Sequence, residues 1–283
     1  MKTDLPILLR MAAWWSAHGI RGRGVVSRCI GRWQPTKPPL FIQTRNGAAL
    51  SVDYNNFDVY ANIYNNGGCW DENVMDCCEH LLRPGDVFYD IGANTGIFAL
   101  DLAKIIPNLK VVAFEPQPSL AENIRRSAER NAFANFAVLE VMLGRDDRQA
   151  DLFLTSHSIH ASVVPRESKF RRLQVTMNTI DTVVTGQIAP PPDIIKIDVE
   201  GSELSAFVGA AKTLSEYQPT LIFEADENMV RMGYTISDLF SELSQAAAYS
   251  YFLIDNAGAL NPAKPPLKHG NYVALSPQHV TRV

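Results

Sequence analysis

The sequence predicts an α/β fold with a doubly wound, mostly parallel sheet, and three observations support this prediction. Short apolar runs of strand length alternate with longer segments of helical periodicity along most of the chain. The spacings between these runs are too long for hairpins, so crossover helices are expected to connect parallel strands. Several runs also end in an acidic residue, which places polar groups where such sheets bind ligands.

The expected elements follow from these patterns. The strands are residues 41–44, 49–52, 87–90, 111–115, 136–143, 151–155, 173–177, 193–201, 220–224, 251–254 and 272–275. The helices are residues 73–82, 96–106, 119–133, 202–214 and 237–247. The first two strands form a hairpin around Asn46-Gly47, and residues 62–68 form a loop. Ser119 and Glu122 have the spacing of a capping box at the start of a helix.

Residues 1–40 form a basic segment, which we expect to be partly helical and to precede a main domain of residues 41–283. The segment carries seven basic residues against one acid, together with three tryptophans. Its apolar stretch at residues 5–9 is too short for a signal peptide. Two interpretations remain open: a helical lid that packs on the main domain, or a basic amphipathic segment that contacts a membrane surface peripherally or an anionic substrate.

The overall composition argues against a nucleic-acid-binding protein and against a membrane-spanning protein. A formal net charge of -4 leaves no basic footprint for nucleic acid, and no apolar run approaches the roughly 18 residues of a membrane-spanning helix. The four cysteines include no C-x-x-C pair, so we expect reduced thiols in a cytoplasmic protein. The sequence does not specify an oligomeric state.

The stretch from Val87 to Leu100 organises the rest of the chain. It reads as a buried strand, a tight turn at residues 92–96 and the start of a helix, which together form a cradle for a polar or charged ligand. Glycine suits this turn because of its backbone freedom and because a Cβ would hold the ligand away. An ordinary strand-to-helix turn would show the same short motif.

Glu115 indicates that the ligand contains a nucleoside. It ends the second long strand 23 positions after Gly92, the offset expected for an acid that accepts hydrogen bonds from both ribose hydroxyls. The alternative role is a helix-cap acid, worth at most about 1 kcal/mol. Asn94 replaces the central glycine of a dinucleotide-binding turn, so S-adenosylmethionine fits the cradle better than a dinucleotide. The expected cofactor-binding residues are Asp90, Gly92, Ala93, Asn94, Thr95, Gly96, Glu115 and Pro116.

The fourth long strand carries the candidate catalytic residues. Lys196, Asp198 and Glu200 are spaced by two, so an extended strand would present them on one face. Charges on a central strand are costly unless they pair or take part in function. A purely structural ion pair between Lys196 and Asp198 is the alternative.

These motifs together resemble the FkbM family of S-adenosylmethionine-dependent methyltransferases. The resemblance rests on the blocks Pro84–Gly96, Ala113–Pro116, Ile195–Gly201 and Phe223-Glu224, and it covers roughly residues 70–275. It implies a Rossmann-like class I methyltransferase fold whose last two strands are antiparallel. It also implies methylation of a hydroxyl group on a sugar, glycan or natural-product acceptor.

Within this hypothesis we assign Asp198 as the base or orienting acid, Lys196 as the residue that polarises the acceptor or tunes Asp198, and Glu200 as a weaker third candidate. His157 and His160, in a polar loop, are rival bases. We expect no metal ion. Two other functions compete: a nicotinamide-dependent oxidoreductase, and a non-catalytic nucleoside-binding scaffold protein.

Overall fold

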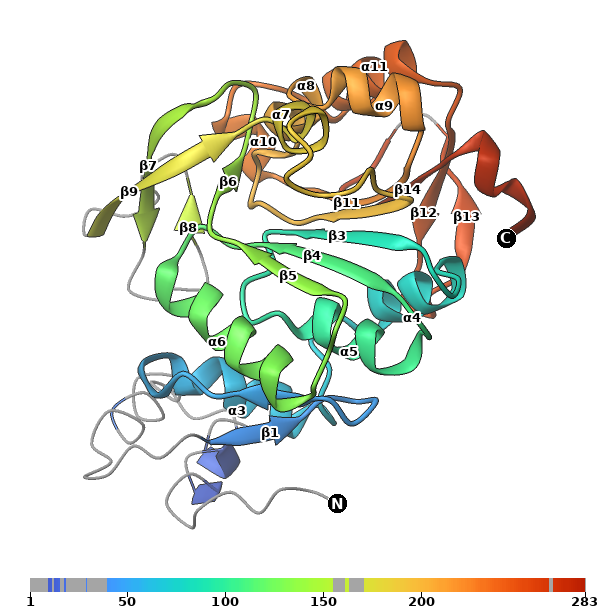
Figure 1. Ribbon diagram of the computed structural model, residues 1–283. Coiled ribbons are helices and arrows are strands. Elements are labelled where there is room, and N and C mark those ends of the chain that lie inside the picture. The colour runs from blue at the N-terminus through green and yellow to red at the C-terminus, as the bar shows by residue number, and fades with distance from the viewer. Residues whose placement is uncertain are drawn as a thin grey trace.

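The computed structural model describes residues 10–11, 13–15, 18, 29, 40–154, 161–162, 171–264 and 267–282. An eight-stranded sheet forms its centre and lies between two groups of helices (Figure 1). The strand order is β13 (Leu260–Pro262), β12 (Ser250–Ile254), β14 (Gly270–Leu275), β11 (Thr220–Ala225), β10 (Ile194–Ile197), β3 (Val87–Ile91), β4 (Lys110–Phe114) and β5 (Phe136–Leu139).

The directions of these strands confirm the predicted Rossmann-like class I methyltransferase fold. The five strands from β11 to β5 are parallel, and β14 pairs antiparallel with both β11 and β12. After β3 the chain moves outward through β4 to β5 and then crosses to β10 on the other side of β3. The strand order therefore reverses between β3 and β10, the point at which open α/β sheets bind ligands.

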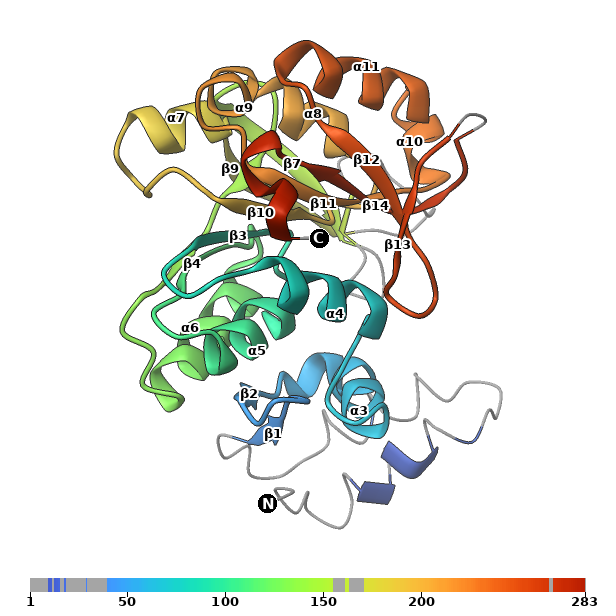
Figure 2. The ribbon, with the colours of Figure 1, turned by 90° about the vertical axis from the view of Figure 1, so that its right-hand side faces the viewer.

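Helices cover both faces of the sheet (Figures 1 and 2). One face carries α4 (Glu72–Leu81), α5 (Ile97–Ile105) and α6 (Pro118–Arg130). The other carries α7 (Ile180–Thr185), α8 (Glu203–Val208), α9 (Ala211–Tyr217) and α11 (Ile236–Ala246). Phe88 and Tyr89, adjacent in β3, belong to the two opposite cores. The strands read as continuous apolar runs because both of their faces are buried.

The structure corrects several predicted boundaries. The strand expected over residues 136–143 is split, because β6 (Met142–Leu143) joins a separate sheet with β7 (Arg148–Leu154), β8 (Ala161–Ser162) and β9 (Arg171–Asn178). The helix expected over residues 202–214 breaks at Gly209, where a Cβ would lie 2.0 Å from the carbonyl oxygen of Gly144. Helix α6 begins after Gln117, so the capping box predicted at Ser119 is wrong.

The remaining elements are η1 (Tyr54–Asn56), α3 (Phe57–Asn65), α10 (Asn228–Arg231) and η2 (Pro277–Arg282). Helix α3 was not predicted, and its last turn occupies part of the loop expected at residues 62–68. Its buried residues join the core beneath α4 and α5, so burial against the domain stabilises a helix with little intrinsic signal.

The predicted hairpin of β1 (Phe41–Gln43) and β2 (Ala49–Ser51) lies outside the main sheet and packs on α6. Its turn is fastened to α5 by Asp101, whose side chain is fully buried. One carboxylate oxygen accepts a hydrogen bond from the Thr44 hydroxyl and, at 2.9 Å, from the backbone N–H of Asn46. The other accepts from the Asn46 side-chain amide at 3.0 Å. A buried carboxylate thus joins the hairpin to the domain.

Most of the basic segment lies outside the described residues. Ala13 is an exception: it is buried, and its carbonyl oxygen accepts a hydrogen bond from the side chain of Asn65 at 2.7 Å. The lid and membrane interpretations, and the division at residue 40, stay predictions. Within the described ranges, none of the helices combines the length and apolarity needed to cross a bilayer. The four cysteines are free thiols.

We expect Asp101→Ala to lower the free energy of unfolding by about 2–3 kcal/mol, because the buried hydroxyl of Thr44 and the half-buried N–H groups of Asn46 would lose their acceptor. Urea denaturation followed by circular dichroism measures the change. Asp146→Ala, at an exposed acid paired with Arg148, is the control and should stay within about 0.5 kcal/mol. A loss at Asp101 no larger than the control would contradict this role.

Candidate active site

The candidate site lies at the switch point, where the carboxyl ends of β3 and β10 meet. Gly92 follows β3 with a φ of +76°, and a Cβ there would lie 2.0 Å from the carbonyl oxygen of Asp198. Gly96 has a φ of +80°, and its Cβ would lie 2.8 Å from the Ile124 side chain. Both glycines are therefore required by contacts within the protein. The sequence argument gave backbone freedom and room for the ligand as the reasons, and it did not anticipate these contacts within the protein.

Two cavities meet at this point. The larger cleft holds about 860 Å³ of space, measured out to open solvent, and the smaller one about 360 Å³. Trp70, Gly92, Asn94 and Asp198 border both cavities. Apolar side chains line much of the larger cleft: Ile91, Phe114, Val141, Met142, Leu143 and Leu152. This apolar lining offers room for a flat, weakly polar group such as a nucleobase.

The turn after β3 is fastened to the end of β4. The backbone N–H groups of Gly92 and Ala93 donate to the carbonyl oxygen of Phe114 at 3.1 and 3.0 Å. Asn94 adopts a φ of +54°, in the left-handed region. Ala93 and Thr95 border the smaller cavity. The N–H groups of Asn94 and Gly96 also donate within the protein, to Glu115 at 2.8 Å and to the carbonyl oxygen of Ala93 at 2.7 Å, so the turn is held by hydrogen bonds along most of its length.

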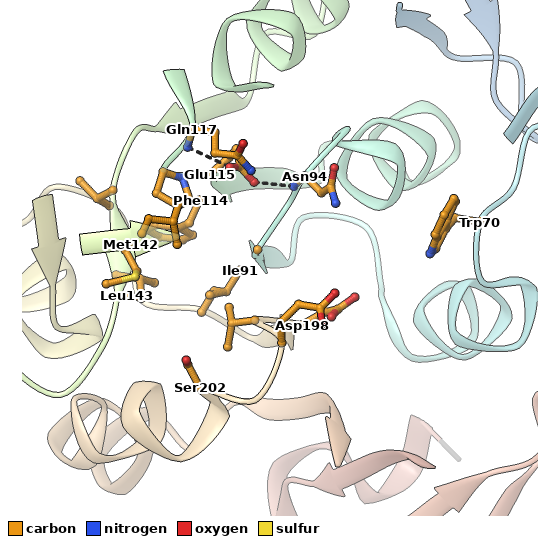
Figure 3. A pocket seen from close by; sticks show the side chains of 16 residues that line it. Trp70, Ile91, Asn94, Phe114, Glu115, Gln117, Met142, Leu143, Asp198 and Ser202 are labelled. Carbon is orange, nitrogen blue, oxygen red and sulfur yellow. Dashed lines mark hydrogen bonds between the residues drawn. The ribbon is translucent and has the colours of Figure 1, made fainter. Parts of the chain in front are cut away.

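Glu115 lies beside this turn and borders the larger cleft. Its side chain is almost fully buried, and its two carboxylate oxygens accept the backbone N–H groups of Asn94 at 2.8 Å and Gln117 at 2.9 Å (Figure 3). Burial raises the pKa of Glu115 to about 7, although these two hydrogen bonds oppose the rise. The two oxygens of a carboxylate offer about four acceptor positions in all, so Glu115 can also receive a hydroxyl group of a ligand. Pro116 borders the same cleft.

Lys196 is a buried cation held between two acids. The parallel register places it opposite Asp90, and its Nζ lies 3.4 Å from Asp90 Oδ1 and 3.6 Å from Asp198 Oδ2. The ammonium also lies 4.5 Å from the centre of the Phe98 ring. Burial alone would lower the pKa of Lys196, but the charges of Asp90 and Asp198 hold it above its usual value. Lys196 is therefore charged and cannot act as a base.

Asp90 lies beneath the turn and is fully buried. One oxygen accepts the backbone N–H of Ala99, in the first turn of α5, at 3.2 Å, and the other faces Lys196. Burial raises the pKa of Asp90, and the positive charge of Lys196 opposes the rise. Asp90 is not among the residues that border either cavity. Its position suits holding Lys196 and α5 in place.

The predicted common face of Lys196, Asp198 and Glu200 is only partly present. Strand β10 ends at Ile197, and Glu200 has a φ of +57°, so the period of two stops after Asp198. The Asp198 side chain is 39% exposed and borders both cavities. Glu200 borders only the larger cleft, where its carboxylate receives the side-chain amide of Asn228 at 3.4 Å.

Two further acids surround this turn. Glu203, which the sequence argument missed, accepts the backbone N–H groups of Val199 at 3.1 Å and Gly201 at 3.3 Å. Burial raises its pKa to about 8. The pKa of Glu224 is also raised, to about 7, chiefly by burial and then by the negative charge of Asp198. An acid in the first turn of a helix was the available signal for Glu203.

Not every predicted site residue lies in the described part of the chain, and some residues of the site were not predicted. His157 and His160 lie outside the described residues, so their role as rival bases stays a prediction. In the described part of the chain, no group of three or more histidine, cysteine or acidic side chains is arranged to hold a metal ion. Trp70, Gln117 and the apolar lining were not anticipated, because no sequence motif marks them.

Comparisons with known proteins identify the family of this chain. The profile of the methyltransferase FkbM domain matches residues 90–251, more than half of the chain. Hexuronic acid methyltransferase AglP of Haloferax volcanii is 26% identical over 176 residues, which span 62% of this chain and 69% of that protein. The 31-O-demethyl-FK506 methyltransferase FkbM of Streptomyces tacrolimicus is 45% identical over 53 residues, 19% of this chain and 20% of that protein.

Among solved structures, methyltransferase FkbM from Methylobacillus flagellatus KT aligns with 78% of this chain at 19% identity and a TM-score of 0.48. The alignment spans 54% of that chain, about half of its length. The profile match runs from Asp90 to Tyr251 and so contains the glycine turn, Glu115 and the segment from Lys196 to Glu200. This chain belongs to the FkbM family of methyltransferases.

Proposed function

We propose that this protein transfers the methyl group of S-adenosylmethionine to a hydroxyl group of a sugar, glycan or natural-product acceptor. One observation carries the proposal: Asp198, a partly exposed carboxylate beside a charged lysine, stands where the two cavities meet. One cavity can then hold the methyl donor and the other can admit the acceptor. The names of the two relatives, a hexuronic acid methyltransferase and a 31-O-demethyl-FK506 methyltransferase, support an oxygen-bearing acceptor.

The residues present fit S-adenosylmethionine. Glu115 offers acceptor positions for the two ribose hydroxyls, and the apolar lining around Phe114 and Leu143 suits the adenine ring. Asn94 and Asp198 offer polar groups toward the charged end of the molecule. When bound, the cofactor supplies a methyl group made electrophilic by a sulfonium. In this proposal Glu115, Asn94 and the turn at residues 92–96 hold the donor, and Asp90 keeps that turn in place.

Asp198 is the group that we assign to receive the hydroxyl proton of the acceptor. Lys196 cannot take this proton because it is already charged, but it holds Oδ2 of Asp198 at 3.6 Å. Oδ1, for which no hydrogen bond or ion pair to a described residue is found, is the oxygen that we assign to the acceptor. Proton removal by a positioned base contributes about 10²–10⁴-fold to rate. Glu200 stays the weaker candidate because it borders only the larger cleft.

The two competing functions have less support than methyl transfer. Membership of a methyltransferase family argues against a nicotinamide-dependent oxidoreductase. A non-catalytic scaffold would bind the donor without turnover. Incubation with S-adenosylmethionine and hydroxylated acceptors, with mass spectrometry of the products, separates these functions, because catalysis yields an acceptor that is heavier by one methyl group. Full binding of the donor with no methylated product from any sugar or natural-product extract would favour the scaffold.

Asp198→Asn is expected to lower kcat by about 10²–10⁴-fold, with a much smaller effect on the dissociation constant of S-adenosylhomocysteine, the demethylated product of the donor. Asn keeps the size of Asp but cannot accept the proton. Steady-state kinetics and calorimetry measure the two quantities, with Asp146→Asn as a control at an exposed acid that borders neither cavity. Full turnover in Asp198→Asn, together with lost turnover in His157→Ala, would move the base to the polar loop.

The affinity for S-adenosylhomocysteine is expected to rise with pH and to level off above the pKa of Glu115, which is about 7 in the free protein. The ribose hydroxyls donate to the ionised carboxylate, so below this pKa binding must first remove a proton and weakens by about tenfold per pH unit. Calorimetry across this range measures the slope. Glu115→Gln should remove most of the pH dependence, and an unchanged slope in that variant would contradict the assignment.

A further inference from the structure

Trp70 is a large apolar side chain left exposed inside the candidate site. It lies between α3 and α4, before the residues that the family profile matches. Its side chain is 40% exposed and borders both cavities. Among the described large apolar residues that remain exposed, Trp70 alone borders these two cavities. An indole in this position offers a broad surface that a ligand can cover.

The backbone on both sides of Trp70 is fastened to the protein. The carbonyl oxygen of Gly68 accepts the backbone N–H of Arg45 at 2.9 Å, which ties the segment to the hairpin. The carbonyl oxygen of Asp71 accepts the N–H of Met75 at 3.0 Å and so opens α4. A ring carried on a fixed backbone loses little further freedom on binding, so more of its contact energy remains as affinity.

Carboxylates lie close to this indole. Figure 3 shows Trp70 on the side of the cleft toward which Asn94 and Asp198 point. Asp71 follows Trp70 directly, and its side chain does not cap α4. Burial, and then the negative charge of Asp198, raise the pKa of Asp71, but only Asp198 borders the two cavities with Trp70. An apolar ring with neighbouring carboxylates matches a sugar, which has an apolar C–H face and hydroxyl groups that donate hydrogen bonds.

We propose that Trp70 is the platform on which the ring of a sugar acceptor stacks, with Asp198, which borders the same two cavities, as an acceptor for its hydroxyl groups. This inference rests on the proposed function, because it assigns the acceptor of the same site. Trp70 precedes the segment shared with the family. The platform therefore makes the choice of acceptor a property of this chain's own N-terminal elements.

An acceptor with an ammonium group is the competing class, since an indole also attracts cations. Sites for such cations use several aromatic faces in a cage. In the smaller cavity the other described ring, that of Phe98, already contacts the Lys196 ammonium at 4.5 Å. Because a single available indole in this cavity does not form a cage, the aromatic arrangement favours the sugar.

Nuclear magnetic resonance of the full chain with ¹⁵N-labelled tryptophan tests the platform. The chain has four tryptophans, and Trp70→Phe assigns the Trp70 indole signal. With S-adenosylhomocysteine present in excess, methyl glycosides of glucose, galactose, mannose and rhamnose are added in turn, and choline serves as the cationic probe. We expect at least one glycoside to shift the Trp70 signal. The signal of Trp14, which is 56% exposed and borders neither cavity, should stay unchanged.

Affinities of the variants complete the test. Trp70→Ala should weaken binding of that glycoside by about tenfold, Trp70→Phe should restore most of it, and the affinity for S-adenosylhomocysteine should change by less than about twofold. The platform is overturned if no glycoside shifts the Trp70 signal, if only choline does, or if Trp70→Ala weakens S-adenosylhomocysteine as much as the glycoside.

The two proposals fail separately. If S-adenosylhomocysteine binds but no glycoside shifts the Trp70 signal, the proposal of a methyl-donor site is retained and the proposal of the Trp70 platform is rejected. If glycosides shift Trp70 while calorimetry detects no binding of S-adenosylhomocysteine, the platform stands and the proposed function falls.

Discussion

The arrangement of Asp90, Lys196 and Asp198 is the interaction on which the site depends. Parallel pairing of β3 with β10 places a buried cation opposite a buried anion at the point where the strand order reverses. Removing Lys196 would leave the carboxylate of Asp90 buried without its cation, which is far more costly than the net worth of the pair. The trio therefore fixes the position of Asp198, its one partly exposed member, at the meeting point of the two cavities.

Close approach of the same two strands explains the glycine turn. Gly92 touches the carbonyl of Asp198, and the N–H groups after it are fastened to the end of β4. Glu115 then joins this turn to the start of α6 through its two backbone hydrogen bonds. Three strand ends are thereby locked together before any ligand arrives. Such preorganisation lets binding energy be used for positioning reactants, which can supply about 7–11 kcal/mol toward a reaction.

The sequence predicted the architecture well because its signals are local. Both faces of β3, β4, β10 and β11 are buried, so each strand appears as an apolar run, and the helices between them carry their own periodicity. The turn at residues 92–96 and Glu115 were recognisable because their spacing is short and motif-like. Even there the reason for Gly92 was incomplete, since its contact with Asp198 is tertiary.

The missed features depend on contacts between distant segments. Trp70 sits in a loop without periodicity, and only the packing of α3, α4 and the hairpin brings it to the cleft. Glu200 left the predicted face because the backbone turns into the left-handed region, a choice that its own side chain does not signal. Glu203 looks like an ordinary residue of a first helical turn until its two backbone hydrogen bonds are seen.

A crystal structure of the protein with S-adenosylhomocysteine most directly tests the central claim, that the methyl donor binds between Glu115 and Asp198. The account predicts the ribose hydroxyls on Glu115, the adenine against the apolar lining near Leu143, and the sulfur close to Asp198. A complex that places the nucleoside away from Glu115, or the sulfur at the far end of the cleft from Asp198, would contradict it.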